Sequence, residues 1–271
     1  MVSPNWTHYL WSTYRACPCN AKAFDLTLLK HFILFVLLVF VTPALATVAW
    51  WVLQERPGNW RSADWTSSGV LPVATADRDA AVYVMAARTG GLKGAFSLHS
   101  WIVLKREGSA TYDRYDKVGW GSPIRKNSRP ADGRWYSNEP MIVHKVQGAS
   151  VEALIARVEQ AISTYPYAKS GDYHVWPGPN SNSFVAHVLR SVPELGVMPP
   201  NATGRDFAAG LGSIGWSSAT WDFHATLHGL AGISIGATSG IELHFMGLVA
   251  GVDFARPALK IPAYGRVELF G

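Results

Sequence analysis

The stretch with the most chemical content runs from Tyr173 to Arg190 and reads YHVWPGPNSNSFVAHVLR. Its Pro-Gly-Pro segment at 177–179 cannot continue a central strand or a helix. Apolar residues spaced one, three and four apart then predict a short helix, which Pro193 ends. Asn and Ser are preferred helix N-cap residues, yet a helix start also favours negative charge. Ser181 is therefore either a structural cap or a nucleophile placed where an oxyanion would be stabilised.

A nucleophilic serine needs a general base, and His99 is the candidate. Residues 95–105 alternate between two faces as a strand does, and His99 lies in the middle of them. The segment 111–120 would return antiparallel after a hairpin turn, which brings Asp113 and Asp116 near His99. Either carboxylate could orient the imidazole, although a single histidine in a strand is more often structural.

The rest of the chain predicts a mixture of helices and strands. Residues 149–165 form the clearest amphipathic helix, with an apolar stripe along one side. Residues 220–254 alternate with a period of two, which predicts an antiparallel meander rather than a second membrane span. Because strands and helices do not alternate regularly, the fold class is α+β. We expect the His99 strand and the meander to share one antiparallel sheet, with the helices packed against it.

Two pairs of residues could suggest a metal site. His224 and His228 have the spacing that a helix would need to share an ion, but on a strand they lie about 13 Å apart. Cys17 and Cys19 supply only two ligands, which do not make a zinc site. We therefore expect no metal site and no cofactor.

An apolar segment of 22 residues without a charge, 32–53, is long enough to cross a bilayer as a helix. It separates a head, residues 1–31, from a linker, residues 54–78, and a domain, residues 79–271. The head has three basic residues and one acidic residue, a net charge of +2, whereas the charges just after the segment cancel. The positive-inside rule then places the head in the cytoplasm and the domain on the outside.

A cleaved signal peptide is the alternative to an anchor. Ala44-Leu45-Ala46 resembles a small-residue cleavage site after an apolar run, with the cut after Ala46. The apolar run continues through Leu53, which favours the uncleaved anchor. Both alternatives export the same domain. The expected location is the inner (cytoplasmic) membrane, with the main domain periplasmic or extracytoplasmic.

Composition narrows the class of partner. The net charge of +5 is modest, and the basic residues are scattered instead of forming the stripe that nucleic-acid binders use. Twelve Trp and ten Tyr fit a protein that works near a membrane or binds sugars and lipids, although aromatic residues also fill ordinary cores. We therefore expect a membrane partner and no nucleic acid.

The block Trp176–Phe184, WPGPNSNSF, resembles the bacterial domain-of-unknown-function family numbered 3750, together with His99-Ser100-Trp101 and Gly119-Trp120-Gly121 upstream. This resemblance covers nearly all of the exported domain and implies no activity. More distantly, the chain resembles the circularly permuted papain-like group, which includes NlpC-type cell-wall hydrolases and lecithin:retinol acyltransferases. In that group a strand histidine comes first and a helix-initiating Asn-Cys-Glu-His-Phe-like motif comes later.

The papain-like resemblance implies roles for individual residues. Ser181 takes the nucleophile position and His99 the base position. Apart from the resemblance, Asp116 is the candidate for the orienting carboxylate. The candidate oxyanion-binding or substrate-binding residues are Asn180, Asn182, Ser183 and Trp101. The thiol of the group is replaced by a hydroxyl, so a strong base and oxyanion donors become necessary.

Two classes of function follow from these residues. In the first, the protein is a membrane-anchored envelope hydrolase or acyltransferase of the serine-variant papain-like type. It would act on an ester or amide of a lipid, a lipoprotein or peptidoglycan. In the second, the fold is kept and the chemistry is lost, which leaves a membrane-tethered binding or scaffold domain. The missing thiol favours the second class, and the retained His99 favours the first.

Overall fold

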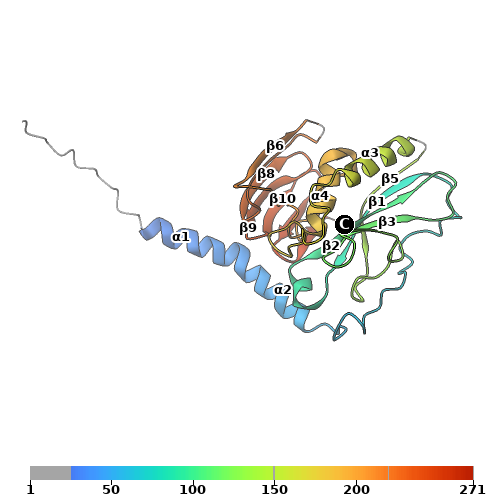
Figure 1. Cartoon of the computed structure of the whole chain (residues 1–271). Helices are drawn as coiled ribbons and strands as arrows, with labels where there is room; N and C mark the ends of the chain where they lie inside the picture. Colours follow the sequence, from blue (N-terminus) through green and yellow to red (C-terminus); the bar gives the residue numbers. More distant parts are fainter. Residues whose placement is uncertain (1–25, 149, 219, 271) are drawn as a thin grey trace, which may run out of the picture.

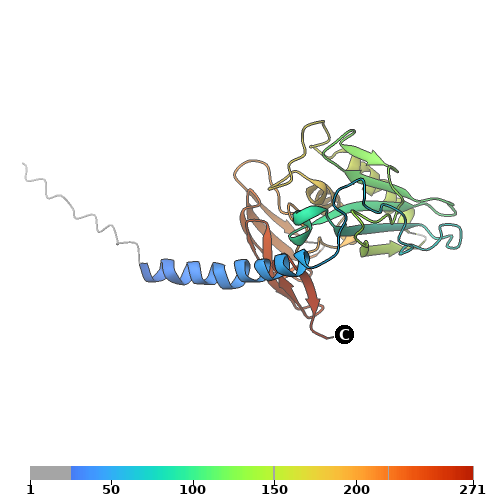
Figure 2. The ribbon, with the colours of Figure 1, turned by 90° about the horizontal axis from the view of Figure 1, so that it is seen from below.

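A computed structural model describes residues 26–148, 150–218 and 220–270. Cys17 and Cys19 lie outside the described residues. The chain begins with a continuous apolar helix made of α1 (Leu26–Val36), a π-helical turn (Leu37–Val41) and α2 (Thr42–Val52). This helix of 27 residues is long and apolar enough to cross a membrane, as an anchor or a signal sequence would be. Figure 2 shows this helix extending well beyond the rest of the molecule.

The predicted apolar helix is thus present, and it begins six residues earlier than the segment 32–53. Its π-helical turn lies directly before Pro43, which has no backbone N–H to donate to the preceding turn. The Thr42 hydroxyl donates instead to the Leu37 carbonyl oxygen at 2.9 Å. The helix therefore changes its hydrogen-bond pattern locally at the proline and continues beyond it.

The first sheet has five antiparallel strands in the order β4-β3-β2-β1-β5. They are β1 (Ala81–Arg88), β2 (Leu98–Lys105), β3 (Asp113–Lys117), β4 (Ile124–Lys126) and β5 (Met141–Gln147). Two helices, α3 (Val151–Ser163) and α4 (Ser181–Ser191), pack on one face of this sheet (Figure 1). The predicted hairpin and both predicted helices are therefore confirmed.

Both faces of the first sheet are covered. On the helix face, Val84 of β1 and Ile102 of β2 pack against Phe184 of α4 in one buried cluster. On the other face, Trp101 packs with Leu71 of the linker and Trp135 of the 121–140 loop. Segments that had no visible period in the sequence thus act as the second layer over the sheet.

The second sheet is a meander of seven antiparallel strands in the order β12-β11-β10-β9-β8-β7-β6. They are β6 (Ser213–Ser217), β7 (Asp222–Leu227), β8 (Ala231–Gly236), β9 (Gly240–Phe245), β10 (Leu248–Asp253), β11 (Ala258–Ile261) and β12 (Gly265–Glu268). The expectation that the meander shares one sheet with the His99 strand is wrong. Short turns pair each strand with its neighbour in sequence, as at Met246-Gly247, where both φ angles are positive. The meander is therefore complete without the first sheet.

The seven strands are in register, so each face of the second sheet carries aligned rows of side chains. One row is apolar on every strand: Trp216, Phe223, Ile235, Ile241, Val252, Leu259 and Val267. The neighbouring row points to the opposite face: Gly215, His224, Ser234, Glu242, Gly251, Lys260 and Arg266. Glu242 and Lys260 are buried, whereas Ile241 and Leu259 are about two-fifths exposed. This sheet thus turns its polar face inward and its apolar face outward.

Candidate functional site

The structure brings His99 and Asp116 together on the face of the first sheet that the loop covers. The His99 Nε2 atom lies 2.9 Å from Asp116 Oδ1. Asp116 also accepts hydrogen bonds from Arg114 Nε at 2.7 Å and Arg114 Nη2 at 2.9 Å. The His99 ring stacks on Trp135 with 3.5 Å between centroids, and Trp101 stacks at 5.8 Å. The histidine is therefore enclosed between two indoles and a buried ion pair.

The electrostatics of this pair favour a neutral histidine beside an ionised carboxylate. Burial lowers the pKa of His99, and the hydrogen bond with Asp116 only partly opposes that effect. Burial alone would raise the pKa of Asp116, but Arg114 and the hydrogen bonds from His99 and Arg114 lower it to about 2. Because the ionised carboxylate is an acceptor only, His99 must donate its Nε2 proton to Asp116.

The polar residues at the start of α4 hold the helix in place. Asn180 Oδ1 accepts from the backbone N–H groups of Asn182 at 2.9 Å and Ser183 at 3.1 Å. Ser183 Oγ accepts in return from the Asn180 backbone N–H at 2.7 Å, which completes a capping box. Three of the predicted oxyanion-binding residues thus make structural hydrogen bonds among themselves.

Asn182 also fastens α4 to strand β2. Its Oδ1 accepts from the Ser100 hydroxyl at 2.9 Å, and its Nδ2 donates to the Leu98 carbonyl oxygen at 2.9 Å and the Thr203 carbonyl oxygen at 2.8 Å. Asn182 is 1% exposed, so these bonds are shielded from water. The side chain is therefore a buried link between helix and sheet.

Ser181 is buried beside Tyr173, with which it shares a hydrogen bond. Burial raises the pKa of Tyr173, and the hydrogen bond with Ser181 only partly opposes that effect. The phenol is therefore protonated at neutral pH and cannot take the serine proton.

His99 and Ser100 are adjacent in β2, so their side chains point to opposite faces of the sheet. Ser100 reaches α4 through Asn182, whereas the His99 ring stacks on Trp135 on the other face. The structure thus places the helix that carries Ser181 and the His99 ring on opposite faces of the first sheet. It brings together the predicted base and carboxylate, but it does not bring the predicted nucleophile to them.

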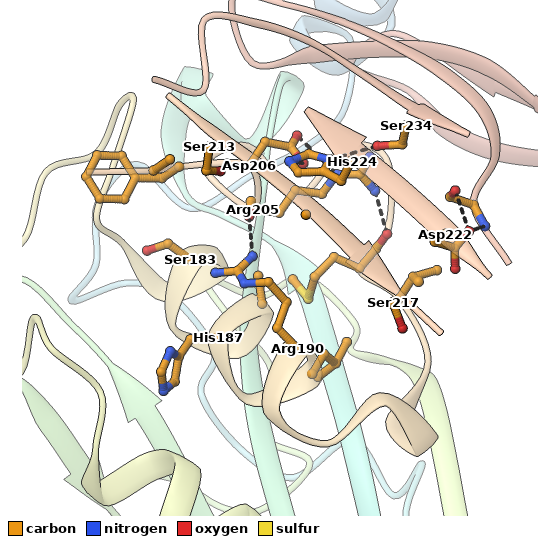
Figure 3. A pocket seen from close by; sticks show the side chains of 18 of the residues that line it. Ser183, His187, Arg190, Arg205, Asp206, Ser213, Ser217, Asp222, His224 and Ser234 are labelled. Carbon is orange, nitrogen blue, oxygen red and sulfur yellow. Dashed lines mark hydrogen bonds and ion pairs between the residues drawn. The ribbon is translucent and has the colours of Figure 1, made fainter. Parts of the chain in front are cut away.

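A cleft of about 600 Å³ opens between α4, the segment 205–209 and the inward face of the second sheet. In Figure 3, Ser183, His187 and Arg190 project from α4, and Asp206, His224 and Ser234 lie across from them. Aromatic residues, including Tyr165, Tyr167 and Phe207, complete the walls. An apolar cleft with a few convergent polar groups is typical of a small-molecule site.

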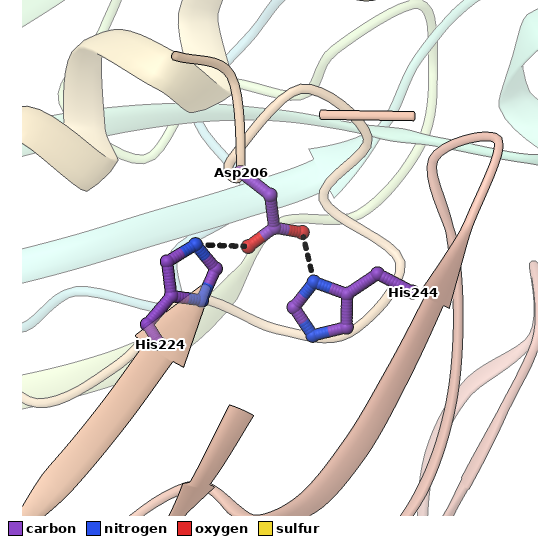
Figure 4. Close-up of side chains that lie close together, drawn as sticks. All are labelled: Asp206, His224 and His244. Carbon is purple, nitrogen blue, oxygen red and sulfur yellow. Dashed lines mark ion pairs between the residues drawn. The ribbon is translucent and has the colours of Figure 1, made fainter. Parts of the chain in front are cut away.

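Asp206 and His224 line the cleft, and together with His244 they form a polar cluster (Figure 4). His244 Nδ1 lies 3.3 Å from Asp206 Oδ2, and His224 Nε2 lies 4.0 Å from Asp206 Oδ1. One nitrogen or oxygen atom from each residue lies within 4.8 Å of the others. His244 Nδ1 is buried and makes no hydrogen bond to another described residue.

Hydrogen bonds behind the cluster orient its histidines. Ser234 Oγ lies 2.9 Å from His224 Nδ1 and 3.3 Å from His244 Nε2, and His244 Nε2 lies 3.2 Å from Glu242 Oε2. Burial lowers the pKa of His224, with Asp206 opposing, so its imidazole is neutral at pH 7. Each histidine therefore has one nitrogen held by an outer partner and the other directed at Asp206.

A buried ion network lies next to the cluster. Glu242 pairs with Arg205 and, at 2.6 Å, with Lys260 Nζ. Burial alone would raise the pKa of Glu242, but Arg205, His244 and Lys260 hold it well below its usual range. Arg205 Nε also lies 3.3 Å from Asp206 Oδ2. Glu242 is thus ionised, and ion pairs hold both carboxylates in position.

The sequence interpretation missed this cluster because it paired His224 with His228. His228 lies in the turn after β7, and its Nδ1 donates to the Gly210 carbonyl oxygen at 2.8 Å. His244 comes instead from β9, two strands away from His224. In β9, the polar residues Glu242 and His244 alternate with apolar residues, which indicates that they share one face of the sheet. This pattern could have indicated a partner for His224.

Comparison with known proteins gives one match. Residues 79–207 match the family described as Protein of unknown function (DUF3750). This match confirms the resemblance that the WPGPNSNSF block indicated, but it ends at residue 207 and does not cover nearly all of the domain 79–271, as had been expected. No curated protein or solved structure matches the chain. None of these comparisons supports the resemblance to the papain-like group. The DUF3750 region contains the first sheet, α3, α4 and Asp206, whereas His224 and His244 lie beyond it.

Proposed function

We propose that this protein is a membrane-tethered envelope domain that rests on the bilayer surface and binds an amphipathic ligand in its cleft. The observation that carries the proposal is the continuity between the apolar helix and the apolar face of the second sheet. Phe40 of the helix lies 5.5 Å from Phe245 of β9, between ring centroids, and Trp50 lies 6.0 Å from Tyr264. Helix and sheet therefore offer one apolar surface.

The position of these contacts along the helix supports contact between the second sheet and the bilayer surface. A bilayer needs about 20 apolar residues of helix, so a span that begins anywhere between Leu26 and Phe32 includes Phe40. The sheet that contacts Phe40 would then meet the bilayer at the depth of the acyl chains or headgroups. Membrane-surface elements bury their apolar faces by about 5–10 Å in this way. Exposed Leu259 and Ile241 lie on the face that would be covered.

The exported location remains part of the proposal. The net charge of the head supports an N-terminus in the cytoplasm and a periplasmic domain. A reporter fused after Gly271 that works only outside the cytoplasm tests this orientation. Lipids and lipoproteins present apolar chains and polar heads together, and the cleft likewise combines Tyr167 and Phe207 with Arg190 and Asp206.

If the apolar face of the second sheet rests on the bilayer, Leu259 should contact lipid. In a chain whose Cys17 and Cys19 are replaced by serine, a fluorophore on Leu259→Cys should be strongly quenched by brominated lipids in nanodiscs. The same fluorophore on Val73→Cys should not be quenched, because Val73 is exposed on the linker that covers the first sheet. Equal quenching at the two positions, or none at residue 259, would contradict the proposal. A label at residue 259 that is shielded from lipid and water alike would indicate a second copy of the chain on this face.

A serine-dependent hydrolase or acyltransferase remains the second proposal, and the position of Ser181 in the first turn of α4 is the observation that favours it. If Ser181 is a nucleophile, the wild-type chain should react with a serine-directed phosphonyl probe, and Ser181→Ala should not. If Ser181 is structural, the wild-type chain stays unlabelled and Ser181→Ala lowers the unfolding free energy by roughly 0.5–2 kcal/mol, as loss of a helix-start hydroxyl does. Ser191→Ala is a matched control at the exposed other end of α4.

A further inference from the structure

We propose that Asp206, His224 and His244 bind a divalent transition-metal ion, Zn²⁺ in the first instance. The donor set is two imidazoles and one carboxylate, which suits zinc and disfavours Ca²⁺ and Mg²⁺, since those ions take oxygen ligands. This assignment goes beyond the membrane-seated function and does not depend on it.

The geometry of the three side chains fits one ion. Ligands at about 2.1 Å from a tetrahedral zinc lie roughly 3.4 Å from each other. The His244 Nδ1 to Asp206 Oδ2 distance is 3.3 Å, and one donor atom from each of the three residues lies within 4.8 Å of the others, so a side-chain rotation of His224 would bring all three onto one ion. Figure 4 shows the two rings on either side of the Asp206 carboxylate.

An independent observation is the buried His244 Nδ1 atom. Its side chain is 2% exposed, and the atom makes no hydrogen bond to another described residue although it is aimed at Asp206. A buried polar atom without a hydrogen bond is costly. A metal ion at this point would use the lone pair of Nδ1 and remove that cost.

The outer hydrogen bonds are those that metal-binding histidines use. A ligating histidine donates its other ring N–H to a carboxylate or another acceptor, which fixes the tautomer and the ring orientation. His244 Nε2 meets Glu242 at 3.2 Å, and His224 Nδ1 meets Ser234 Oγ at 2.9 Å. Both rings are therefore set to present the remaining nitrogen to an ion.

The site opens onto the cleft, which leaves room for a further ligand. The side chain of His224 is 30% exposed and that of Asp206 is 15% exposed, and both line the cleft. Asp206 and Glu242 are balanced by Arg205 and Lys260, so a bound Zn²⁺ would leave the cluster positively charged. Arg190 adds a further guanidinium on the opposite wall. The fourth position would therefore favour an anionic oxygen, such as a carboxylate or a phosphate.

The test measures zinc itself on the full chain purified in detergent without a histidine tag. After equilibrium dialysis against Zn²⁺, the wild type should retain one ion per chain by mass spectrometry of the metal, and Co²⁺ should give visible absorption bands of a tetrahedral site. His224→Ala and Asp206→Asn should each lose the ion. Glu242→Gln, which alters an outer partner of His244 and none of the three ligands, should weaken binding by about 10–100-fold.

His228→Ala and His187→Ala are the matched controls and should retain the ion, because neither side chain belongs to the cluster. The melting temperature of each metal-free variant shows whether it is folded, and His224→Ala is the most tolerant since its side chain is partly exposed. Wild-type chain that keeps no zinc above background would overturn the proposal. So would equal losses in His228→Ala and His224→Ala, which would indicate scattered surface histidines. Lipid contact at Leu259 is unaffected by either result, so the two proposals fail separately.

Discussion

Replacing Arg114 with methionine should lower the free energy of unfolding by roughly 3–5 kcal/mol, as removal of one partner from a buried ion pair does. Arg114 and Asp116 are almost completely buried, and the guanidinium makes two hydrogen bonds to the carboxylate. Methionine would leave an ionised Asp116 in the interior with only His99 as a partner. The guanidinium also stacks over the Trp101 ring at 4.0 Å, and that contact would be lost too.

Urea unfolding in detergent, followed by tryptophan fluorescence, measures this loss. Arg106→Met is the matched control, because Arg106 is half exposed and its ion pairs with Glu152 and Glu159 are on the surface. It should cost about 1 kcal/mol or less. If Arg114→Met is too unstable to purify, the double variant Arg114→Met with Asp116→Asn should recover part of the loss, since it removes the unpaired charge. Equal costs for Arg114→Met and Arg106→Met would show that the buried pair is not important for stability.

The second large effect is expected at Asn182, whose replacement by leucine should cost roughly 3 kcal/mol. Leucine has a similar size but cannot bond to the Ser100 hydroxyl or to the carbonyl oxygens of Leu98 and Thr203. Each buried polar group left without a partner costs about 1–3 kcal/mol, and relaxation around the site would reduce the sum. The same unfolding measurement reports this change.

The Asn182 variant also distinguishes a structural role of this residue from a catalytic one. As a structural link, Asn182 should lower stability in proportion to its lost hydrogen bonds, whether or not any ligand is bound. As an oxyanion donor, it would be directed at a cleft, and its replacement would leave stability nearly unchanged. Asn59→Leu, in an exposed turn of the linker, is the control for the substitution itself and should change stability little. A cost below 1 kcal/mol at Asn182 would contradict the structural role.

The local elements of the first sheet were predictable, whereas the face on which His99 lies was not. The hairpin that pairs β2 with β3 follows from period-two patterns and a turn, and it brings Asp116 to His99. Every residue of β2 is buried, however, because a helix layer covers one face and loops cover the other. Alternation then separates His99 from Ser100, but hydrophobicity cannot say which of them faces α4.

In the second sheet, the strands could be predicted from the sequence, but the contacts between strands that are not neighbours could not. Its meander is visible in the sequence, and each turn that joins neighbouring strands is local. The contact between His224 and His244 is not local: their ring centroids lie 5.5 Å apart across the intervening strand β8. Such a pair depends on the register of three strands, which no single stretch of sequence contains. Whether the meander joins the first sheet depends likewise on how the whole chain packs.

The packing of the apolar helix against the domain determines how far from the membrane the cleft can lie. Phe40, Ala44, Thr47 and Trp51 form one buried stripe along the helix, and the Trp51 indole donates to the Gly91 carbonyl oxygen at 2.9 Å. The linker that follows is folded back over the first sheet through Leu71. The helix is therefore rigidly attached to the domain. If it spans the bilayer, it would hold the cleft at a fixed height above the membrane surface. Molecules that lie at the membrane surface would enter it, and a polymer held farther out would have to come to it.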